Sequence, residues 1–277
     1  MRILVTNDDG IDSVGLHVLA RAMRPFGDVV IVAPDSEYSG ASAAIGALHL
    51  MQPQVERRDV EGIDESWSVT GAPALCVMFA RLNVFGDPFD LVVSGINPGA
   101  NVGRSVYHSG TVGAAMTARS GGVHGIAVSQ AVDNWGVEGQ NWDSMIENQK
   151  WETAADITAI ALHGFLSEPP ADPSVLNINV PNLEMDQLKG WRMTEVAQMP
   201  TKTMTTPDLT AVDGHPGRFD VSLRWGDKIE LPATTDTGAI ERDEVSVTWL
   251  TGVTATSPAN HTATEAALTA ELGTKLS

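Results

Sequence analysis

The first half of the chain alternates short apolar runs with helix-like segments, and this alternation restricts the possible folds more than any other feature. The runs with strand character are residues 2–6, 29–33, 66–70, 90–94 and 125–129. The helix-like segments between them are residues 14–24, 73–84 and 111–120. Several of these strands are apolar almost throughout, as expected where helices cover both faces of a parallel sheet. The sequence therefore predicts an α/β fold with a doubly wound, mostly parallel sheet and right-handed crossovers.

The second half has a different composition. Residues 133–150 predict a long surface loop, residues 151–166 a helix, and residues 175–180 a further strand. After Pro181, short β-like runs predict a β-rich arm, and a capping box followed by Gly273 predicts a tail helix. The β-like runs are residues 191–196, 219–224 and 245–250. We therefore divide the chain into a core, residues 1–181, and a second part, residues 182–277, with the arm, the last core elements and the tail.

Two adjacent carboxylates, Asp8 and Asp9, follow the first predicted strand. In open α/β sheets, ligands bind at the carboxyl ends of the strands. Neighbouring carboxylates repel each other unless a cation or a proton offsets their charge. The pair therefore favours a metal site, although Asp followed by Gly is also typical of an ordinary turn.

Two further predicted strand ends carry oxygen donors. The loop at residues 35–42 contains several hydroxyl groups, and residues 95–101 contain Asn97 and Asn101. Carboxylate, hydroxyl and amide oxygens form a hard ligand set that suits Mg²⁺ or Mn²⁺. The sequence has no Cys/His cluster with zinc spacing, since its histidines are scattered.

Residues 107–115 predict a loop that turns into a helix of small residues. A helix N-terminus has unpaired N–H groups and a partial positive charge, which favour phosphate. Ser109 and Thr111 add hydroxyl donors, and Gly110 allows close approach of the backbone. The alternative is an ordinary Ser/Thr N-cap, and the segment is not a P-loop because the Gly-x-x-x-x-Gly-Lys-Ser/Thr pattern is absent.

The net charge is −18, which argues against nucleic-acid duplexes and membranes as partners, since both favour basic surfaces. No run approaches the roughly 18 apolar residues of a membrane span, and no signal peptide is recognisable. The one cysteine, Cys76, permits no intrachain disulfide. We therefore expect a cytoplasmic protein.

The net negative charge also bears on the substrate. A phosphate substrate would need a bound cation or oriented backbone amides to reverse the local negative potential.

Taken together, these motifs resemble those of the SurE family, the survival-protein-E nucleotidases. The similarity extends from the first strand into the second half of the chain. The matching motifs are Leu4-Val-Thr-Asn-Asp-Asp-Gly-Ile11, Val32-Ala-Pro-Asp35, Ser39-Gly-Ala-Ser42, Leu91-Val-Val-Ser-Gly-Ile-Asn97, Gly99-Ala-Asn101, Ser109-Gly-Thr-Val-Gly-Ala-Ala115, Leu176-Asn-Ile-Asn-Val-Pro181 and Val245-Ser-Val-Thr248.

The resemblance implies a Rossmann-like domain with a C-terminal β-hairpin arm and a tail helix exchanged between subunits of a homodimer or homotetramer. It implies hydrolysis of nucleoside 5′/3′-monophosphates to nucleoside and phosphate, with one divalent cation, Mg²⁺ or Mn²⁺, per subunit. The implied metal ligands are Asp8, Asp9, Ser39 and Asn97. The implied phosphate-binding residues are Gly40, Asn101, Ser109, Gly110 and Thr111.

The chain departs from the family pattern around these residues. Ser36 and Tyr38 stand where the family commonly has arginines. Ala72 and Leu75 replace a threonine and an aspartate. None of these changes affects an implied metal ligand. With fewer cations near the site, we expect weaker binding of highly charged substrates.

Asp9 and Asn101 are the predicted catalytic residues of a metal-assisted hydrolysis. Asp9 would orient or deprotonate the attacking water, with direct attack by an aspartate as the alternative. Asn101 and the donors at residues 109–111 would stabilise charge on the phosphoryl group.

Two other functions compete with this prediction. A signalling receiver domain also has an acid pair after its first strand, but the Asp and Lys that it requires after later strands are absent. A catalytically silent nucleotide-binding relative would account for the missing arginines. The sequence leaves the preferred base and the 5′ or 3′ position open.

Overall fold

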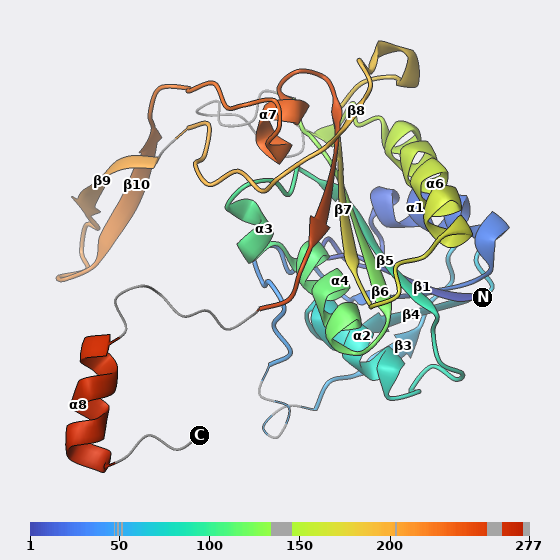
Figure 1. The fold of residues 1–277 in the computed structure, drawn as a ribbon, viewed down its shortest axis with the longest axis horizontal. Coiled ribbons are helices and arrows are strands. Elements are labelled where there is room, and N and C mark those ends of the chain that lie inside the picture. The colour runs from blue at the N-terminus through green and yellow to red at the C-terminus, as the bar shows by residue number, and fades with distance from the viewer. Residues whose placement is uncertain are drawn as a thin grey trace.

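The computed structural model describes residues 1–46, 48, 50, 52–133, 146–202, 204–253 and 262–273. In this part of the chain a nine-stranded sheet has the order β3-β4-β2-β1-β5-β6-β7-β11-β8, and β9 and β10 form a separate pair (Figure 1). The strands are β1 (Arg2–Thr6), β2 (Asp28–Pro34), β3 (Val55–Arg57), β4 (Glu65–Val69), β5 (Leu91–Pro98), β6 (His124–Gln130), β7 (Val175–Val180), β8 (Trp191–Met193), β9 (Met204–Ala211), β10 (Phe219–Trp225) and β11 (Val245–Leu250). The helices are α1 (Val14–Met23), α2 (Pro73–Arg81), α3 (Ser105–His108), α4 (Gly110–Ser120), α6 (Trp151–Ser167), α7 (Asp236–Ile240) and α8 (Thr262–Leu272), with short 3-10 turns at Arg24–Phe26 and Met185–Gln187.

The centre of the sheet is parallel, as the sequence predicts. β1 lies between β2 and β5 and runs parallel to both. In this register Thr6 pairs with Ser94, and further along β5 Asn97 pairs with Ser129 of β6. The carboxyl ends of β1, β5 and β6 therefore lie at one edge of the sheet, where ligands bind in folds of this type.

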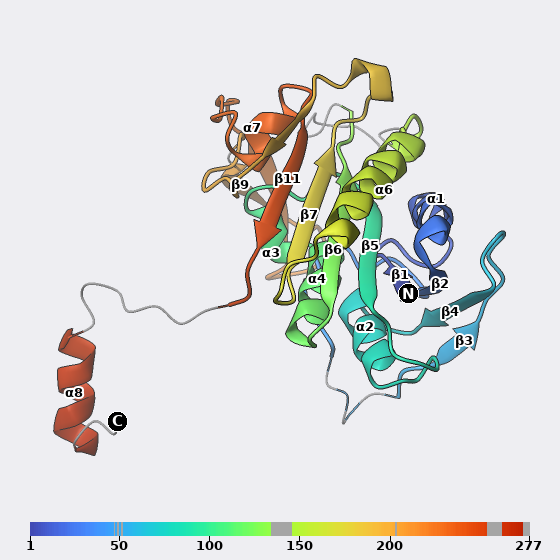
Figure 2. The same ribbon diagram turned by 45° about the vertical axis from the view of Figure 1, so that its right-hand side comes forward.

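Helices cover both faces of the sheet (Figure 2). α1 and α6 pack on one face, where Leu16 and Leu162 join a core cluster with Ile3, Val5 and other strand residues. α2 and α4 cover the other face, where their small and aliphatic residues pack against β1 and β2. Burial on both faces explains why the central strands are mostly apolar.

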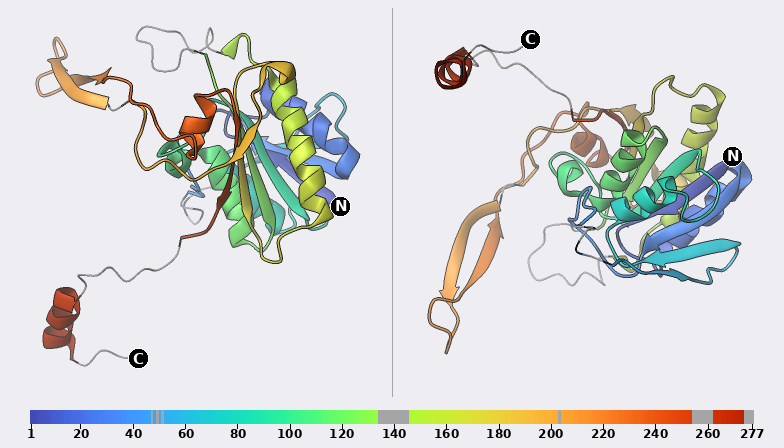
Figure 3. Two further views of the ribbon diagram at one scale, coloured as in Figure 1. Left: turned by 45° about the horizontal axis from the view of Figure 1, so that its top comes forward. Right: turned by 90° about the horizontal axis from the view of Figure 1, so that it is seen from below.

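The late β-like runs do not form one separate arm, so this part of the prediction needs correction. β11 pairs antiparallel with β7, and β8 pairs parallel with β11, so both belong to the main sheet. The part that projects is the β9–β10 hairpin (Figures 1 and 3). The predicted tail helix is confirmed as α8, which lies apart from the sheet and has no buried residue.

Smaller differences concern element ends. α2 ends at Arg81 rather than at residue 84, because Asn83 has a left-handed φ of 60°. β5 continues to Pro98, so Asn97 lies within the strand and not after it. Most of the predicted loop at 133–150 lies outside the described residues, and no described helix is long and apolar enough to cross a membrane.

Candidate functional site

The turn after β1 is held by its own side chains. The buried Asn7 donates from Nδ2 to the Gly10 carbonyl at 3.0 Å, and its Oδ1 accepts from the Gly10 N–H at 3.2 Å. Gly10 has a φ of +102°, which a residue with a side chain rarely adopts. The Ile11 N–H donates to the Pro34 carbonyl of β2 at 2.8 Å. Asn7 was not among the predicted site residues, although it lies next to the acid pair.

Asp8 is buried against the N-terminus of α4, with 3% of its surface exposed. The Thr111 hydroxyl donates to Asp8 Oδ1. Burial raises the pKa of Asp8, and hydrogen bonds from Thr111 and the Gly110 backbone oppose this rise. A Cβ at Gly110 would lie 2.8 Å from Asp8 Oδ2, so only glycine permits this approach. The fold thus brings Asp8, Gly110 and Thr111 together across more than a hundred residues of sequence.

Asp9 lacks the partners that Asp8 has. Its Oδ2 is buried and has no hydrogen-bond partner in the part of the chain that the structure describes. Burial raises the pKa of Asp9 to about 8, and the nearby carboxylates of Asp8 and Glu37 add to the shift. A buried carboxylate oxygen without a donor is costly unless a proton or a cation compensates it.

The loop that carries Ser39 and Gly40 is anchored at both of its ends. At one end the Tyr38 N–H donates to the Asp8 carbonyl at 2.7 Å. At the other end the Ser42 N–H donates to the His108 carbonyl at 3.0 Å, and Ser42 Oγ donates to the Tyr107 carbonyl at 2.9 Å. Ser39 and Gly40 are exposed between these anchors, close in sequence to the contact with Asp8.

Asn97 and Asn101 are held by polar contacts within the sheet edge. Asn97 Nδ2 donates to the Gly99 carbonyl at 2.6 Å, which leaves Oδ1 available. Asn101 Nδ2 donates to Ser129 Oγ at 2.8 Å, and the Asn101 N–H donates to Asn179 Oδ1 at 2.7 Å. The Asn101 carbonyl accepts from the amides of Asn177 and Asn179 at 3.0 and 3.2 Å.

Sequence reasoning missed the residues that hold Asn101. Asn177 and Asn179 alternate with apolar residues in β7 and are fully buried, and so is Ser129. Buried amides need partners, so the alternation of asparagine with Val, Leu and Ile in a predicted core strand was the available signal. It indicates a strand that supports a polar loop.

Ser109 is the N-cap of α4, a role that does not exclude contact with phosphate. Its Oγ accepts from the Val112 N–H at 3.0 Å. Thr111 is completely buried, and its hydroxyl donates to Asp8. Contacts of Ser109, Gly110 and Thr111 with phosphate stay predictions, and the described contact of Thr111 is with the acid pair.

The donor set fits a divalent cation. Asp9 offers a buried oxygen without a described partner beside a second carboxylate, and the described hydrogen bond of the Asn97 side chain uses Nδ2 and not Oδ1. In the described part of the chain no group of three or more His, Cys, Asp or Glu side chains could hold a metal. A cation here would therefore need hydroxyl, amide or water oxygens in addition to the acid pair, as Mg²⁺ and Mn²⁺ accept.

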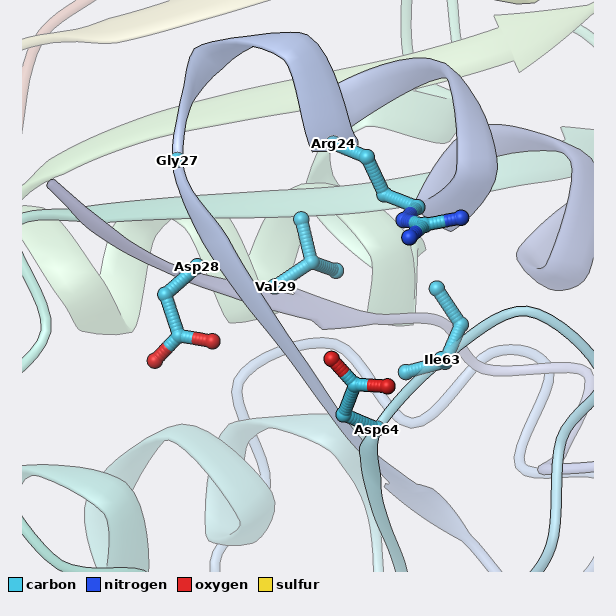
Figure 4. A pocket seen from close by; sticks show the side chains of 6 residues that line it. All are labelled: Arg24, Gly27, Asp28, Val29, Ile63 and Asp64. Carbon is cyan, nitrogen blue, oxygen red and sulfur yellow. The ribbon is translucent and has the colours of Figure 1, made fainter.

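The hollow drawn in Figure 4 lies elsewhere in the molecule. Arg24 follows α1, Asp28 begins β2 and Asp64 precedes β4, so these lining residues lie at the amino ends of parallel strands. Asp8 and Asp9 lie at the opposite, carboxyl edge. The hollow is therefore not part of the candidate site.

The raised pKa of Asp9 predicts how the stability of the metal-free protein depends on pH. Between about pH 4, the ordinary Asp value, and about pH 8, the folded chain holds a proton that the unfolded chain has released. The free energy of unfolding should therefore fall as pH rises through this window. Denaturant unfolding in chelator should show this fall in the wild type and a weaker one in Asp9→Asn. Equal slopes in the two proteins would contradict the assignment.

The family model described as "Survival protein SurE" matches residues 3–203. The chain belongs to the SurE family. This membership decides against a receiver domain. A SurE relative named 5′/3′-nucleotidase, from Erwinia tasmaniensis, is 36% identical over 90% of each chain. Another, named 5′-nucleotidase, from Legionella pneumophila, has the same identity and coverage.

A solved structure confirms the predicted fold class. The crystal structure of a SurE protein from Aquifex aeolicus matches with a TM-score of 0.75 and 27% sequence identity. The match covers 98% of this chain and 100% of that chain. The α/β fold with its additional C-terminal elements is therefore that of the SurE family.

Proposed function

We propose that this chain is a metal-dependent phosphomonoesterase that hydrolyses nucleoside 5′/3′-monophosphates to nucleoside and phosphate. The observation that carries the proposal is the unpartnered, buried Oδ2 of Asp9 beside the carboxylate of Asp8. The relatives named nucleotidases support the substrate class.

The residues proposed to hold one Mg²⁺ or Mn²⁺ are Asp8, Asp9, Ser39 and Asn97. When bound, the cation supplies a Lewis acid that polarises a phosphoryl oxygen and lowers the pKa of water. Thr111 and the Gly110 backbone keep Asp8 in place. The hydrogen bond from Asn97 Nδ2 to the Gly99 carbonyl fixes the side-chain amide of Asn97, and its Oδ1 is the atom proposed to bind the cation.

Asp9 and Asn101 are the proposed catalytic residues. Asp9 has an oxygen free of hydrogen bonds, so it can orient the attacking water and take its proton. Asn101, with the second proton of its side-chain amide, and the Ser109 hydroxyl at the start of α4 would donate hydrogen bonds to the phosphoryl oxygens. Ser109 can still donate its hydroxyl proton, since its oxygen only accepts from Val112 in the described contacts. Gly40 adds a backbone group from the neighbouring loop.

Release of phosphate from a panel of nucleoside 5′- and 3′-monophosphates tests the proposal. We expect turnover with Mg²⁺ or Mn²⁺ and none with chelator, because the acid pair alone supplies no compensating positive charge. Nucleotides with more phosphates should be poorer substrates, because Ser36 and Tyr38 are uncharged at the loop beside Ser39.

The same panel of nucleotides tests the alternative function, a catalytically silent nucleotide-binding protein. Tight nucleotide binding without turnover at any tested cation would identify a catalytically silent relative and contradict the proposed activity. Turnover that persists in chelator would contradict metal dependence.

We also propose that the chain assembles as a homodimer or homotetramer. The hairpin exposes Leu209 and, opposite it in the register, Val221, with 65% and 61% of their surfaces accessible. A two-stranded hairpin is marginally stable in water on its own, so a partner that covers this face would stabilise it. Light scattering of the full chain measures the assembly. The cytoplasmic location stays a prediction.

A further inference from the structure

Asp236 is a buried carboxylate remote in sequence from the candidate site. It is the first residue of α7 and is completely buried. Its Oδ2 accepts from the Gly103 N–H at 2.8 Å. Its Oδ1 accepts from the N–H groups of Ala197 and Thr237 at 3.0 and 2.7 Å, and from the Thr237 hydroxyl at 3.2 Å.

These bonds join three segments of the chain at one carboxylate. Gly103 belongs to the connection between β5 and α4, which carries Asn101, contains the short helix α3 and ends at Ser109; we call it the loop at residues 101–109. Ala197 precedes the β9–β10 hairpin, and Asp236 follows it. Asp236 therefore connects the base of the hairpin to the loop proposed to bind phosphate.

The packing at this junction is tight. Gly103 has a φ of +53°, and a Cβ there would lie 3.3 Å from the Ala197 carbonyl oxygen and 3.4 Å from Thr237 Oγ1. The loop is thus held at Asn101 by the asparagines of β7, at Gly103 by Asp236, and at Ser109 by the N-cap of α4. Of these three anchors, Asp236 is the one that comes from beyond the hairpin.

A carboxylate in this place is suited to fixing a backbone. It has two oxygens with several acceptor positions and no donor, so it can bind N–H groups from different segments at once. Bonds between ionised acceptors and N–H donors are stronger than neutral ones. Such support matters where small displacements reduce catalysis, as they do for groups that contact a transition state.

We infer that Asp236 is a positioning residue that fixes the loop at residues 101–109 for its contacts with phosphate. The inference deepens the proposed function, since it assigns to Asp236 the orientation of Asn101 and Ser109. It also couples the site to the segment from which the hairpin projects.

The test compares Asp236→Asn with the wild type in the full chain. The amide keeps the size of the side chain, but its NH₂ group then faces a backbone N–H. We expect faster hydrogen exchange in residues 101–109 and unchanged exchange in β1. With adenosine 5′-monophosphate, kcat should fall by about 10- to 100-fold, while the affinity for Mn²⁺ alone stays at the wild-type value.

Glu244→Gln is the matched control, since it makes the same acid-to-amide change in the same part of the chain. Glu244 pairs with Arg192 at 2.7 and 2.8 Å. This variant should keep wild-type kcat and wild-type exchange in residues 101–109. If Asp236→Asn does not fold, Thr237→Val replaces it, with an expected fall in kcat of about 2- to 10-fold.

The inference is overturned if the folded variant keeps wild-type exchange in residues 101–109, or if Mn²⁺ affinity falls in proportion to kcat. A Thr237→Val variant with wild-type kcat and wild-type exchange in residues 101–109 would also overturn the inference. Absence of nucleotidase activity in the wild type would instead refute the proposed function. The exchange measurement still decides the positioning role in that case.

Discussion

Replacement of Asp9 by asparagine should abolish metal-dependent phosphate release. Asn keeps the volume of the side chain but removes the carboxylate that would face the cation with a negative charge, and with it the group proposed to take the proton from water. We expect kcat with Mn²⁺ to fall by at least about 10³-fold, the loss expected when several kcal/mol of charge stabilisation disappear. A direct titration should also show weaker binding of Mn²⁺. The measurement is the initial rate of phosphate release with nucleoside monophosphate.

Asp12→Asn provides the control for this experiment. Asp12 lies in the same stretch of sequence, but its side chain is 79% exposed and pairs at the surface with Arg58. Surface ion pairs of this kind contribute little to stability, so this variant should keep wild-type activity and Mn²⁺ affinity. Wild-type turnover by Asp9→Asn would refute the assignment of Asp9 as both ligand and catalytic residue.

The second large effect is expected from Gly110→Ala. A Cβ at this position would lie 2.8 Å from both Cβ and Oδ2 of Asp8, closer than such atoms approach in proteins. Either Asp8 or the start of α4 must move, and both belong to the proposed site. We expect a loss of kcat/KM of about 100-fold. A titration should show weaker Mn²⁺ binding if Asp8 is the group displaced.

Gly164→Ala is the matched glycine control. Gly164 lies in α6, and a Cβ there would have no neighbour within 4 Å. This change should leave activity unaltered and raise the free energy of unfolding by about 0.5–1 kcal/mol, because alanine favours helix. If Gly110→Ala were as active as Gly164→Ala, the close contact between Asp8 and α4 would have no part in the reaction.

The central sheet was predictable because its signals are local. Apolar runs such as those in β1 and β2 identify buried parallel strands, and small residues in α4 identify a helix packed closely on a sheet. The short edge strand β3 is entirely exposed and has no such signal. β11 and β8 were assigned to an arm because their partners, β7 and each other, cannot be inferred from short runs alone.

The candidate site was predictable in its chemistry and less so in its contacts. The acid pair, the hydroxyl-rich loop and Asn97 could be identified because oxygen donors at strand ends suggest a common edge. The sequence did not show which donor forms a hydrogen bond with which acceptor. Thr111 was expected to face phosphate, yet its hydroxyl donates to Asp8, and Asn177, Asn179 and Asp236 gave no indication of their partners.

The sequence by itself determined the alternation of strands and helices in the first half of the chain and the kinds of oxygen atoms available near the strand ends. Only the tertiary structure decided that Asp8 accepts a hydrogen bond from Thr111 while Oδ2 of Asp9 has no partner among the described residues. The physical reason is that secondary structure depends on neighbours along the chain. Burial, hydrogen-bond partners and pKa depend on neighbours in space, which here come from segments up to 133 residues apart.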